Sequence, residues 1–184
     1  ACALAVTQLE KAGMNVKKVS LPSLAGADPA LLLAILPEGT LVHEAWLRQR
    51  PQDYAEMTRQ QLELGALLPA VDYVRAQQYR ARLLRECLEA FQDVDLLVSP
   101  TVAWEAPQED PSVAGGDGAT EARRTGPFNL TGLPAISVPC GFGPAGLPLG
   151  LQITGAPYAE DMVLRVAYAY EQQAGWLGCH PGLD

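Results

Sequence analysis

The sequence predicts an α/β fold with three layers built around one sheet. Segments of helical periodicity alternate with short, isolated apolar runs that suit strands, and this alternation is typical of α/β domains. Of the 184 residues, 48% are hydrophobic and 18% are charged, so the chain can bury the core of one domain.

The first half of the chain is expected to be mainly helical. A helix over residues 2–12 would bury a stripe formed by Ala5, Leu9 and Ala12, and an alternating segment over 15–21 predicts a strand. Two or three short helices are expected within 29–68, with Thr40 and Asp53 as their caps. Because nothing caps the first helix, we expect the chain to be cut from a longer one.

A longer helix is expected from Asp72 to Asp93. Its apolar residues recur at helical spacing and would form the buried stripe: Ala81, Leu84, Cys87, Leu88 and Phe91. The Arg and Glu residues between them form i,i+4 pairs, which are typical of a solvated helix face.

The last part of the chain predicts three strands and a helix. Residues 95–99 form an apolar run suited to a buried strand, whereas 104–126 lack periodicity and predict a loop. Residues 135–139 and 150–154 predict two strands joined as a long hairpin. Glu160 begins a helix that would bury Val163, Val166, Ala167 and Tyr170.

Composition excludes several classes of protein. The net charge of −8 argues against binding to nucleic acid, and no apolar run is long enough to predict a membrane span. Four cysteines without a CxxC motif favour a reducing compartment, so we expect a cytoplasmic protein without a signal peptide. No cluster of His, Cys and carboxylates suggests a metal site, and no cofactor is expected.

No complete active site is evident from the residues alone. His43 and His180 lack a nearby serine in a tight-turn context, and both are interpreted as structural. Cys140 follows a strand, where a nucleophile could lie, but a small buried residue is the favoured interpretation. The glycines in GGDG and GFGPAG lack the sequence context of phosphate-binding loops. The last of the three lysines is Lys18, and no two serines are adjacent.

One segment is specific enough to suggest a family. Residues 127–152, PFNLTGLPAISVPCGFGPAGLPLGLQ, resemble the C-terminal section of the amidase signature family, whose pattern is F-N-x-x-G-x-P-A-x-x-V-P-x-G followed by L-P-x-G-L-Q. The resemblance extends over nearly the whole chain and is weakest over 29–68. It implies that residues 1–184 are the C-terminal part of a single amidase domain, within a three-layer α/β/α fold that has a mixed central sheet.

Physical reasons can be given for parts of this pattern. Pro134 and Pro139 bracket a strand and exclude a helix on either side. Gly132 and Gly141 allow backbone angles or close approaches that a side chain would block. The Asn129 amide can tie a turn to neighbouring backbone.

The resemblance implies an enzyme that hydrolyses a carboxylic amide to an acid and ammonia or an amine. In this family a buried lysine activates a nucleophilic serine through a second serine, and all three lie in the N-terminal half. This chain has no paired serines and no lysine beyond Lys18. It therefore supplies no catalytic residue, and alone it is expected to be inactive.

The resemblance also implies that this half forms the far wall of the acyl pocket, with loop 101–128 facing the nucleophile. Trp104, Thr125 and Asn129 are the candidates for binding a small-molecule amide. For Trp104 the alternative is an anchor that packs the loop down, and for Asn129 it is a tie within a buried turn.

Two other functions stay open. One branch of the family is the A subunit of a tRNA-dependent amidotransferase, which releases ammonia from glutamine. That branch has an acidic residue and an arginine where this chain has Ala122 and Gln61, although Glu121 is one residue away. The other function is a non-catalytic binding or assembly piece, which exposed core surface would cause to associate with itself or with a missing half.

Overall fold

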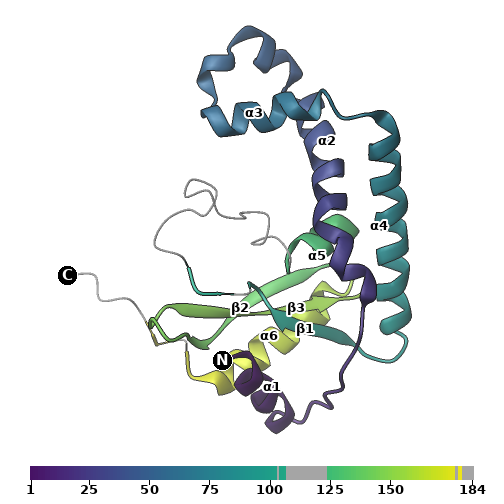
Figure 1. The fold of residues 1–184 in the computed structure, drawn as a ribbon. Coiled ribbons are helices and arrows are strands. Elements are labelled where there is room, and N and C mark those ends of the chain that lie inside the picture. The colour runs from purple at the N-terminus through teal and green to yellow at the C-terminus, as the bar shows by residue number, and fades with distance from the viewer. Residues whose placement is uncertain (103, 107–123, 177, 180–184) are drawn as a thin grey trace, which may run out of the picture.

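The computed structural model describes residues 1–102, 104–106, 124–176 and 178–179. Figure 1 shows a small sheet with helices on both faces and a helical arm, built from residues 27–90, that extends away from it. The elements in chain order are α1 (Cys2–Lys11), η1 (Pro22–Gly26), α2 (Ala27–Gln49), η2 (Pro51–Asp53), α3 (Glu56–Gly65), α4 (Ala70–Ala90), β1 (Leu96–Pro100), α5 (Gly126–Thr131), β2 (Ala135–Phe142), β3 (Pro148–Gly155) and α6 (Glu160–Ala174).

The sheet has three strands in the order β1-β3-β2, and both pairings are antiparallel. The predicted hairpin is confirmed, and its two strands are longer than expected, at eight residues each. The mixed sheet implied by the resemblance is not present in the described residues. A short hairpin can join only antiparallel neighbours, which accounts for the pairing of β2 with β3, and β1 also pairs antiparallel with β3.

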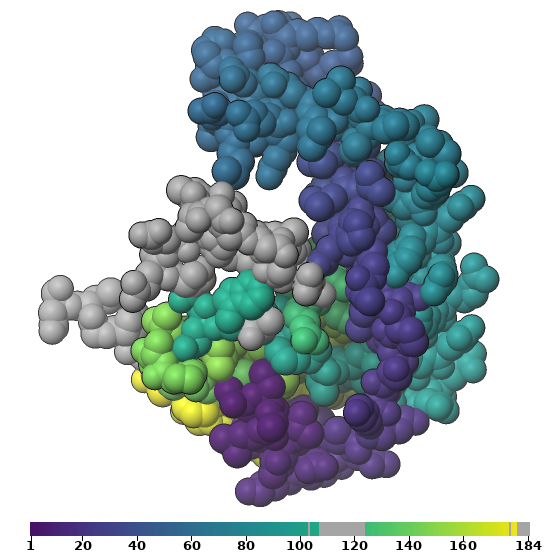
Figure 2. Space-filling model, in the orientation of Figure 1, coloured from purple at the N-terminus to yellow at the C-terminus, as the bar shows by residue number. Residues whose placement is uncertain are grey.

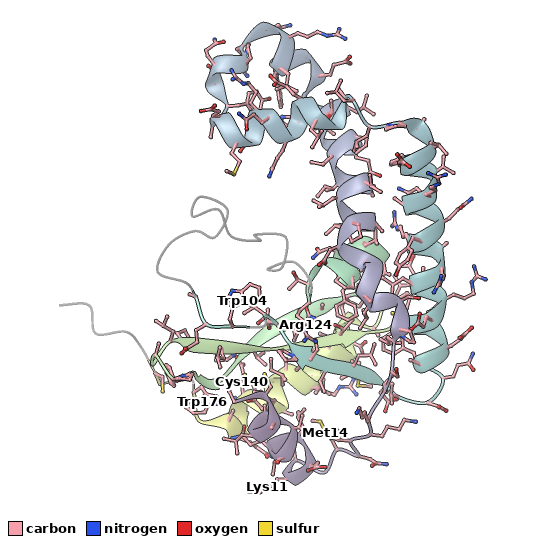
Figure 3. All side chains as sticks on the ribbon, viewed as in Figure 1. Lys11, Met14, Trp104, Arg124, Cys140 and Trp176 are labelled. Carbon is pink, nitrogen blue, oxygen red and sulfur yellow. The ribbon has the colours of Figure 1, made fainter. Side chains whose placement is uncertain are left out.

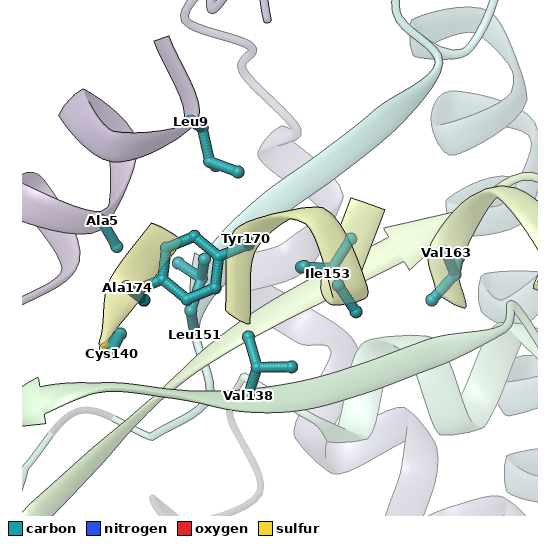
Figure 4. Packing of buried hydrophobic residues seen from close by; sticks show 10 residues of the cluster. Ala5, Leu9, Val138, Cys140, Leu151, Ile153, Val163, Tyr170 and Ala174 are labelled. Atoms are coloured by element: carbon teal, nitrogen blue, oxygen red, sulfur yellow. The ribbon is translucent and has the colours of Figure 1, made fainter. Parts of the chain in front are cut away.

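One face of the sheet is covered by α1 and α6. Ten buried residues form this core: Ala5, Leu9, Val138, Cys140, Leu151, Ile153, Val163, Ala167, Tyr170 and Ala174. Figure 4 shows the Tyr170 ring in the middle of this cluster, with Leu9 of α1 on one side and Val138 of β2 on the other. Three of the four residues in the predicted stripe of the last helix are buried, namely Val163, Ala167 and Tyr170, and Val166 is partly buried against the same core.

A second core lies between α2, α4 and α5 and includes Leu97 of β1 on the opposite side of the sheet. It combines these helices with β1 and the turn after α5: Ala27, Ala30, Ala34, Ala76, Leu83, Cys87, Leu97, Phe128, Leu130 and Leu133. The described residues thus form an α/β structure with a small antiparallel sheet and two separate cores.

The segment 15–21 does not form a strand, which corrects the sequence prediction. It links α1 to η1, and its alternating residues have no strand beside them with which to form a ladder among the described residues. Alternation shows that a segment can present two faces, but a strand also needs a hydrogen-bonding neighbour.

The predicted break near Thr40 is also wrong, because α2 is one continuous 23-residue helix with Pro37 inside it. The Thr40 hydroxyl lies 2.8 Å from the Leu36 carbonyl oxygen and 2.5 Å from that of Leu62 in α3. Thr40 thus joins two crossing helices and does not cap one. Asp53 belongs to η2, and α3 begins at Glu56 without a side-chain cap.

The buried face of α4 is rotated from the predicted stripe. Leu83 and Cys87 are fully buried, whereas Leu88 is 40% exposed and Ala81 is exposed. The side of α4 that packs against α2 and α5 determines which of its apolar residues are buried. Helical periodicity alone is compatible with more than one buried face on this helix. Glu86 accepts hydrogen bonds from the Ser23 backbone N–H at 3.2 Å, so it fastens η1 to this helix.

The stretch Pro22–Gln49 is long and apolar enough, by length and composition, to cross a membrane. This differs from the expectation from the sequence, in which no such run was identified. The helix packs against α3, α4 and α5, but only 17% of this apolar window is buried inside the molecule, and one such helix is weak evidence for a membrane span. Figure 2 shows the arm standing clear of the sheet layer, which gives the molecule a concave outline.

Two matched substitutions test which face of α4 is buried. Leu83→Ala should lower the free energy of unfolding by about 2–5 kcal/mol, because it opens a cavity in the core. Leu88→Ala, on the same helix, should lower it by less than about 1 kcal/mol. Chemical denaturation of both variants measures this difference, and equal losses would contradict the observed helix orientation.

Candidate functional site

A row of polar side chains crosses the sheet on the face opposite α1 and α6. Gln152 of the central strand pairs in register with Ser99 of β1 and with Ser137 of β2. Its side-chain Nε2 donates a hydrogen bond to the Ser99 hydroxyl at 3.1 Å. Because side chains alternate between the two faces of a strand, the apolar neighbours of these residues pack into the α1/α6 core and leave this face polar.

A pair of hydroxyl groups lies beside this row. Thr101 Oγ1 and Ser137 Oγ are 2.6 Å apart and share a hydrogen bond across the central strand. Gly150 makes this possible, because a Cβ there would lie 2.5 Å from Ser137 Oγ and 2.7 Å from Thr101 Oγ1. The glycine in the L-P-x-G-L-Q segment therefore serves a close approach of two side chains.

The short helix α5 borders the same face. Pro127 occupies its first turn, and Gly132 ends it in the left-handed conformation at φ +73°. The Asn129 side-chain Nδ2 donates to the Thr125 carbonyl oxygen at 3.0 Å, as expected for an amide that ties a turn. Gln152 also donates to the Arg124 carbonyl oxygen at 2.9 Å, so the row on the sheet holds the start of α5 in place.

These elements line an open pocket of about 270 Å³. Its lining combines hydroxyl and amide groups with an apolar side: Thr101, Thr125, Phe128, Asn129, Leu133, Ala135, Ile136, Ser137 and Gln152. None of these described lining residues carries a charge. Such a pocket can accept a small uncharged group and orient its polar atoms by hydrogen bonds.

The structure brings two of the three sequence candidates to this pocket. Thr125 and Asn129 line it, whereas Trp104 is not among its lining residues. Figure 3 shows Trp104 and Arg124 on the same side of the sheet. Beside Trp104, the Glu105 carboxylate accepts hydrogen bonds from the backbone N–H groups of Ala145 and Leu147, at 3.1 and 3.2 Å. These bonds anchor the segment after β1 to the hairpin turn, and substrate binding by the three candidates stays a prediction.

Sequence reasoning missed Thr101, Ser137 and Gln152 as lining residues. Thr101 directly follows β1, Ser137 lies in β2 and Gln152 lies in β3, so strand pairing brings them together. A usable signal was present, because Ser137 and Gln152 are each flanked on both sides by apolar residues of a predicted strand.

The other candidates for chemistry have structural surroundings. His43 Nδ1 is 2.9 Å from the Tyr54 hydroxyl, and the His43 ring packs near Trp46 on the arm. Cys140 is buried, and burial raises the pKa of its thiol to about 12, so it stays protonated at neutral pH. No group of three or more potential ligands is placed to hold a metal ion in the part of the chain that the structure describes. His180 and the GGDG glycines lie outside that part.

The family model for amidases matches residues 1–164. The chain belongs to the amidase signature family. It is 35% identical to an amidase of Pseudomonas putida, over 97% of this chain and 40% of that protein. It is also 33% identical to the A subunit of the glutamyl-tRNA(Gln) amidotransferase of Brevibacillus brevis, over 96% of this chain and 41% of that protein.

A solved amidase structure supports the fold of this amidase-family chain. The two superpose with a TM-score of 0.80 at 27% sequence identity, covering 95% of this chain and 42% of the solved one. A fatty acid amide hydrolase of Medicago truncatula is 46% identical over 125 residues, which are 64% of this chain and 20% of that enzyme. The chain thus spans about 40% of the length of the amidase and amidotransferase relatives.

The close approach at Gly150 gives a test of the pocket floor. Gly150→Ala should lower the free energy of unfolding by about 1–2 kcal/mol, because its Cβ collides with both hydroxyl side chains. Adding Ser137→Ala should recover part of this loss. Gly178→Ala, where a Cβ meets no atom within 4 Å, is the control. A Gly150→Ala variant as stable as the wild type would contradict the geometry.

Proposed function

We propose that the full-length protein hydrolyses a carboxylic amide to an acid and ammonia or an amine, and that this chain forms one wall of its acyl pocket. The observation that carries the proposal is the uncharged pocket between α5 and the polar face of the sheet, in a chain of the amidase family. Hydroxyl and amide groups at one side would orient the substrate carbonyl, and the apolar side would hold its acyl group.

The catalytic serines and lysine are proposed to lie outside this chain. A lysine acts as a base only where burial favours its neutral form. All three lysines here are exposed, and the Lys17 ammonium lies 3.6 Å from the Asp93 carboxylate in an exposed ion pair. They are therefore suited to solvated surface positions and not to catalysis.

The A subunit of a tRNA-dependent amidotransferase is the second candidate, because relatives at 33% identity carry that name. Glutamine is a zwitterion, and its charged ends need charged partners. The described lining of the pocket offers none, and Gln61 lies exposed on α3, outside that lining. Ala122 and Glu121 lie outside the described residues. The uncharged lining therefore favours a general amidase.

A non-catalytic assembly role is the third candidate. Large apolar side chains are exposed along the arm, among them Leu41, Val42, Trp46, Met57, Leu64 and Leu67. Exposed apolar surface promotes association, so the isolated chain is expected to self-associate as its concentration rises. Light scattering over a concentration series measures this.

The 184-residue chain alone should release no ammonia from simple amides. The reason is that a serine nucleophile needs a nearby base, and no lysine in the chain is buried. A coupled ammonia assay with a panel of aliphatic and aromatic amides measures this, with the full-length protein as the positive control. Turnover by the pure chain would overturn the placement of the catalytic residues.

In the full-length protein, Ser137→Leu should raise KM for the preferred amide by about tenfold or more, because a larger side chain fills the pocket. Ser20→Leu makes the same chemical change at an exposed position outside the pocket and is the matched control. Steady-state kinetics of both variants measure the effect. Equal KM values would show that the substrate does not occupy this pocket.

A further inference from the structure

Two cysteines that are far apart in the sequence meet beneath the sheet. The sulfur atoms of Cys2, at the start of α1, and Cys140, near the end of β2, are 3.7 Å apart. Cys140 is the residue at which the register of the hairpin shifts, because Pro139 pairs with Gly150 while Gly141 pairs with Leu149. Both thiols are free in this structure.

The two thiols differ in their access to solvent. Cys140 is only 1% exposed and lies in the α1/α6 core, whereas Cys2 is half-buried. Figure 4 shows Cys140 beside Ala174 and Ala5 in that core. Cys2 is therefore the more accessible of the two residues, and its sulfur lies against that of Cys140.

We propose that Cys2 and Cys140 form a disulfide when the protein meets a disulfide oxidant, so that this pair is a site of reversible oxidation. The two sulfur atoms must approach from 3.7 Å to about 2.05 Å. Side-chain rotation at Cys2 and Cys140, together with a small shift of α1 relative to the sheet, would have to close this distance.

The chemistry balances with oxidised glutathione as the oxidant. The Cys2 thiolate attacks one sulfur of glutathione disulfide, forming a mixed disulfide and releasing one glutathione thiolate. The Cys140 thiol then loses its proton and attacks the Cys2 sulfur, which releases the second glutathione. Two protein thiols are oxidised, and one glutathione disulfide is reduced to two glutathiones.

The second step should depend strongly on pH. In the mixed disulfide Cys2 no longer carries a thiol, but Cys140 stays buried, and burial keeps the pKa of its thiol above the usual value, so only a small fraction is thiolate near neutrality. As long as the pH stays below this pKa, the thiolate fraction rises about tenfold for each unit by which the pH increases. Closure of the mixed disulfide should therefore accelerate from about pH 7 to pH 9.

The other two cysteines provide internal comparisons. Cys87 is fully buried in the core on the opposite side of the sheet, and burial raises the pKa of its thiol to about 11. Cys179 is exposed. Oxidation should therefore leave Cys87 reduced and convert Cys179 only to a mixed disulfide with glutathione.

The bond would have a structural consequence. It joins residues separated by 138 positions and fastens α1 to the hairpin. A disulfide that closes a long loop lowers the conformational entropy of the unfolded chain more than one that closes a short loop. The oxidised protein should therefore melt at a higher temperature than the reduced protein. The pocket lies on the other face of the sheet, and its lining contains neither cysteine.

The test is peptide mapping by mass spectrometry after incubation of the full-length protein with glutathione disulfide, followed by alkylation of the remaining thiols. The expected product is a Cys2–Cys140 linked peptide that reduction removes, together with a raised melting temperature. Cys2→Ser should abolish this linkage, and Cys179→Ser should leave it unchanged. Because Cys2 is half-buried, its substitution should be better tolerated than one at Cys140.

The proposal is overturned if the wild-type full-length protein accumulates the mixed disulfide at Cys2 without closing to Cys140 at any pH up to about 9. It is equally overturned if the linked peptides pair other cysteines. Neither of these outcomes depends on whether a variant folds.

Discussion

The central strand β3 is the element on which the rest of the structure depends. Both other strands pair with it, and its side chains alternate between two environments. Leu151 and Ile153 point into the α1/α6 core, while Gly150 and Gln152 belong to the opposite face. Since the period of a strand is two residues, a shift of one position would place polar groups in the core and apolar groups in the pocket.

The shape of the polar face depends on the lack of a side chain at Gly150 as well as on the polar side chains around it. Gly150 leaves room for the Thr101 and Ser137 hydroxyl groups to meet, and Gln152 extends from the row to the backbone before α5. A hydrogen-bonded floor of this kind holds the helix and the strands at fixed positions. The pocket is therefore preorganised by the sheet register.

Local patterns were sufficient to predict the hairpin, the last helix and the first helix, because each rests on periodicity that its own residues carry. Prediction failed where tertiary contacts decide. Thr40 has the chemistry of a cap, but α3 crosses α2 at this residue and the helix continues. Residues 15–21 alternate between apolar and polar side chains but have no neighbouring strand among the described residues. On α4, helical periodicity is compatible with two apolar faces, and packing buries the one that contains Leu83.

The candidate site was predictable only in part for the same reason. Thr125 and Asn129 lie within or beside the segment that carries the family pattern, so the sequence identified them directly. The hydroxyl and amide groups of the sheet become neighbours only through strand pairing, and no local pattern gives that register. Trp104 was selected for its residue type in a polar loop, and the neighbouring Glu105 shows that this segment is fastened to the hairpin turn.

The central claim is that the polar face of the sheet receives the acyl part of an amide. A crystal structure of the full-length protein with a bound, unreactive amide analogue tests this most directly. Ligand atoms are expected within hydrogen-bonding distance of Ser137 or Asn129, between α5 and the sheet. A ligand bound elsewhere, with this pocket empty or filled by side chains from the remainder of the protein, would contradict the claim.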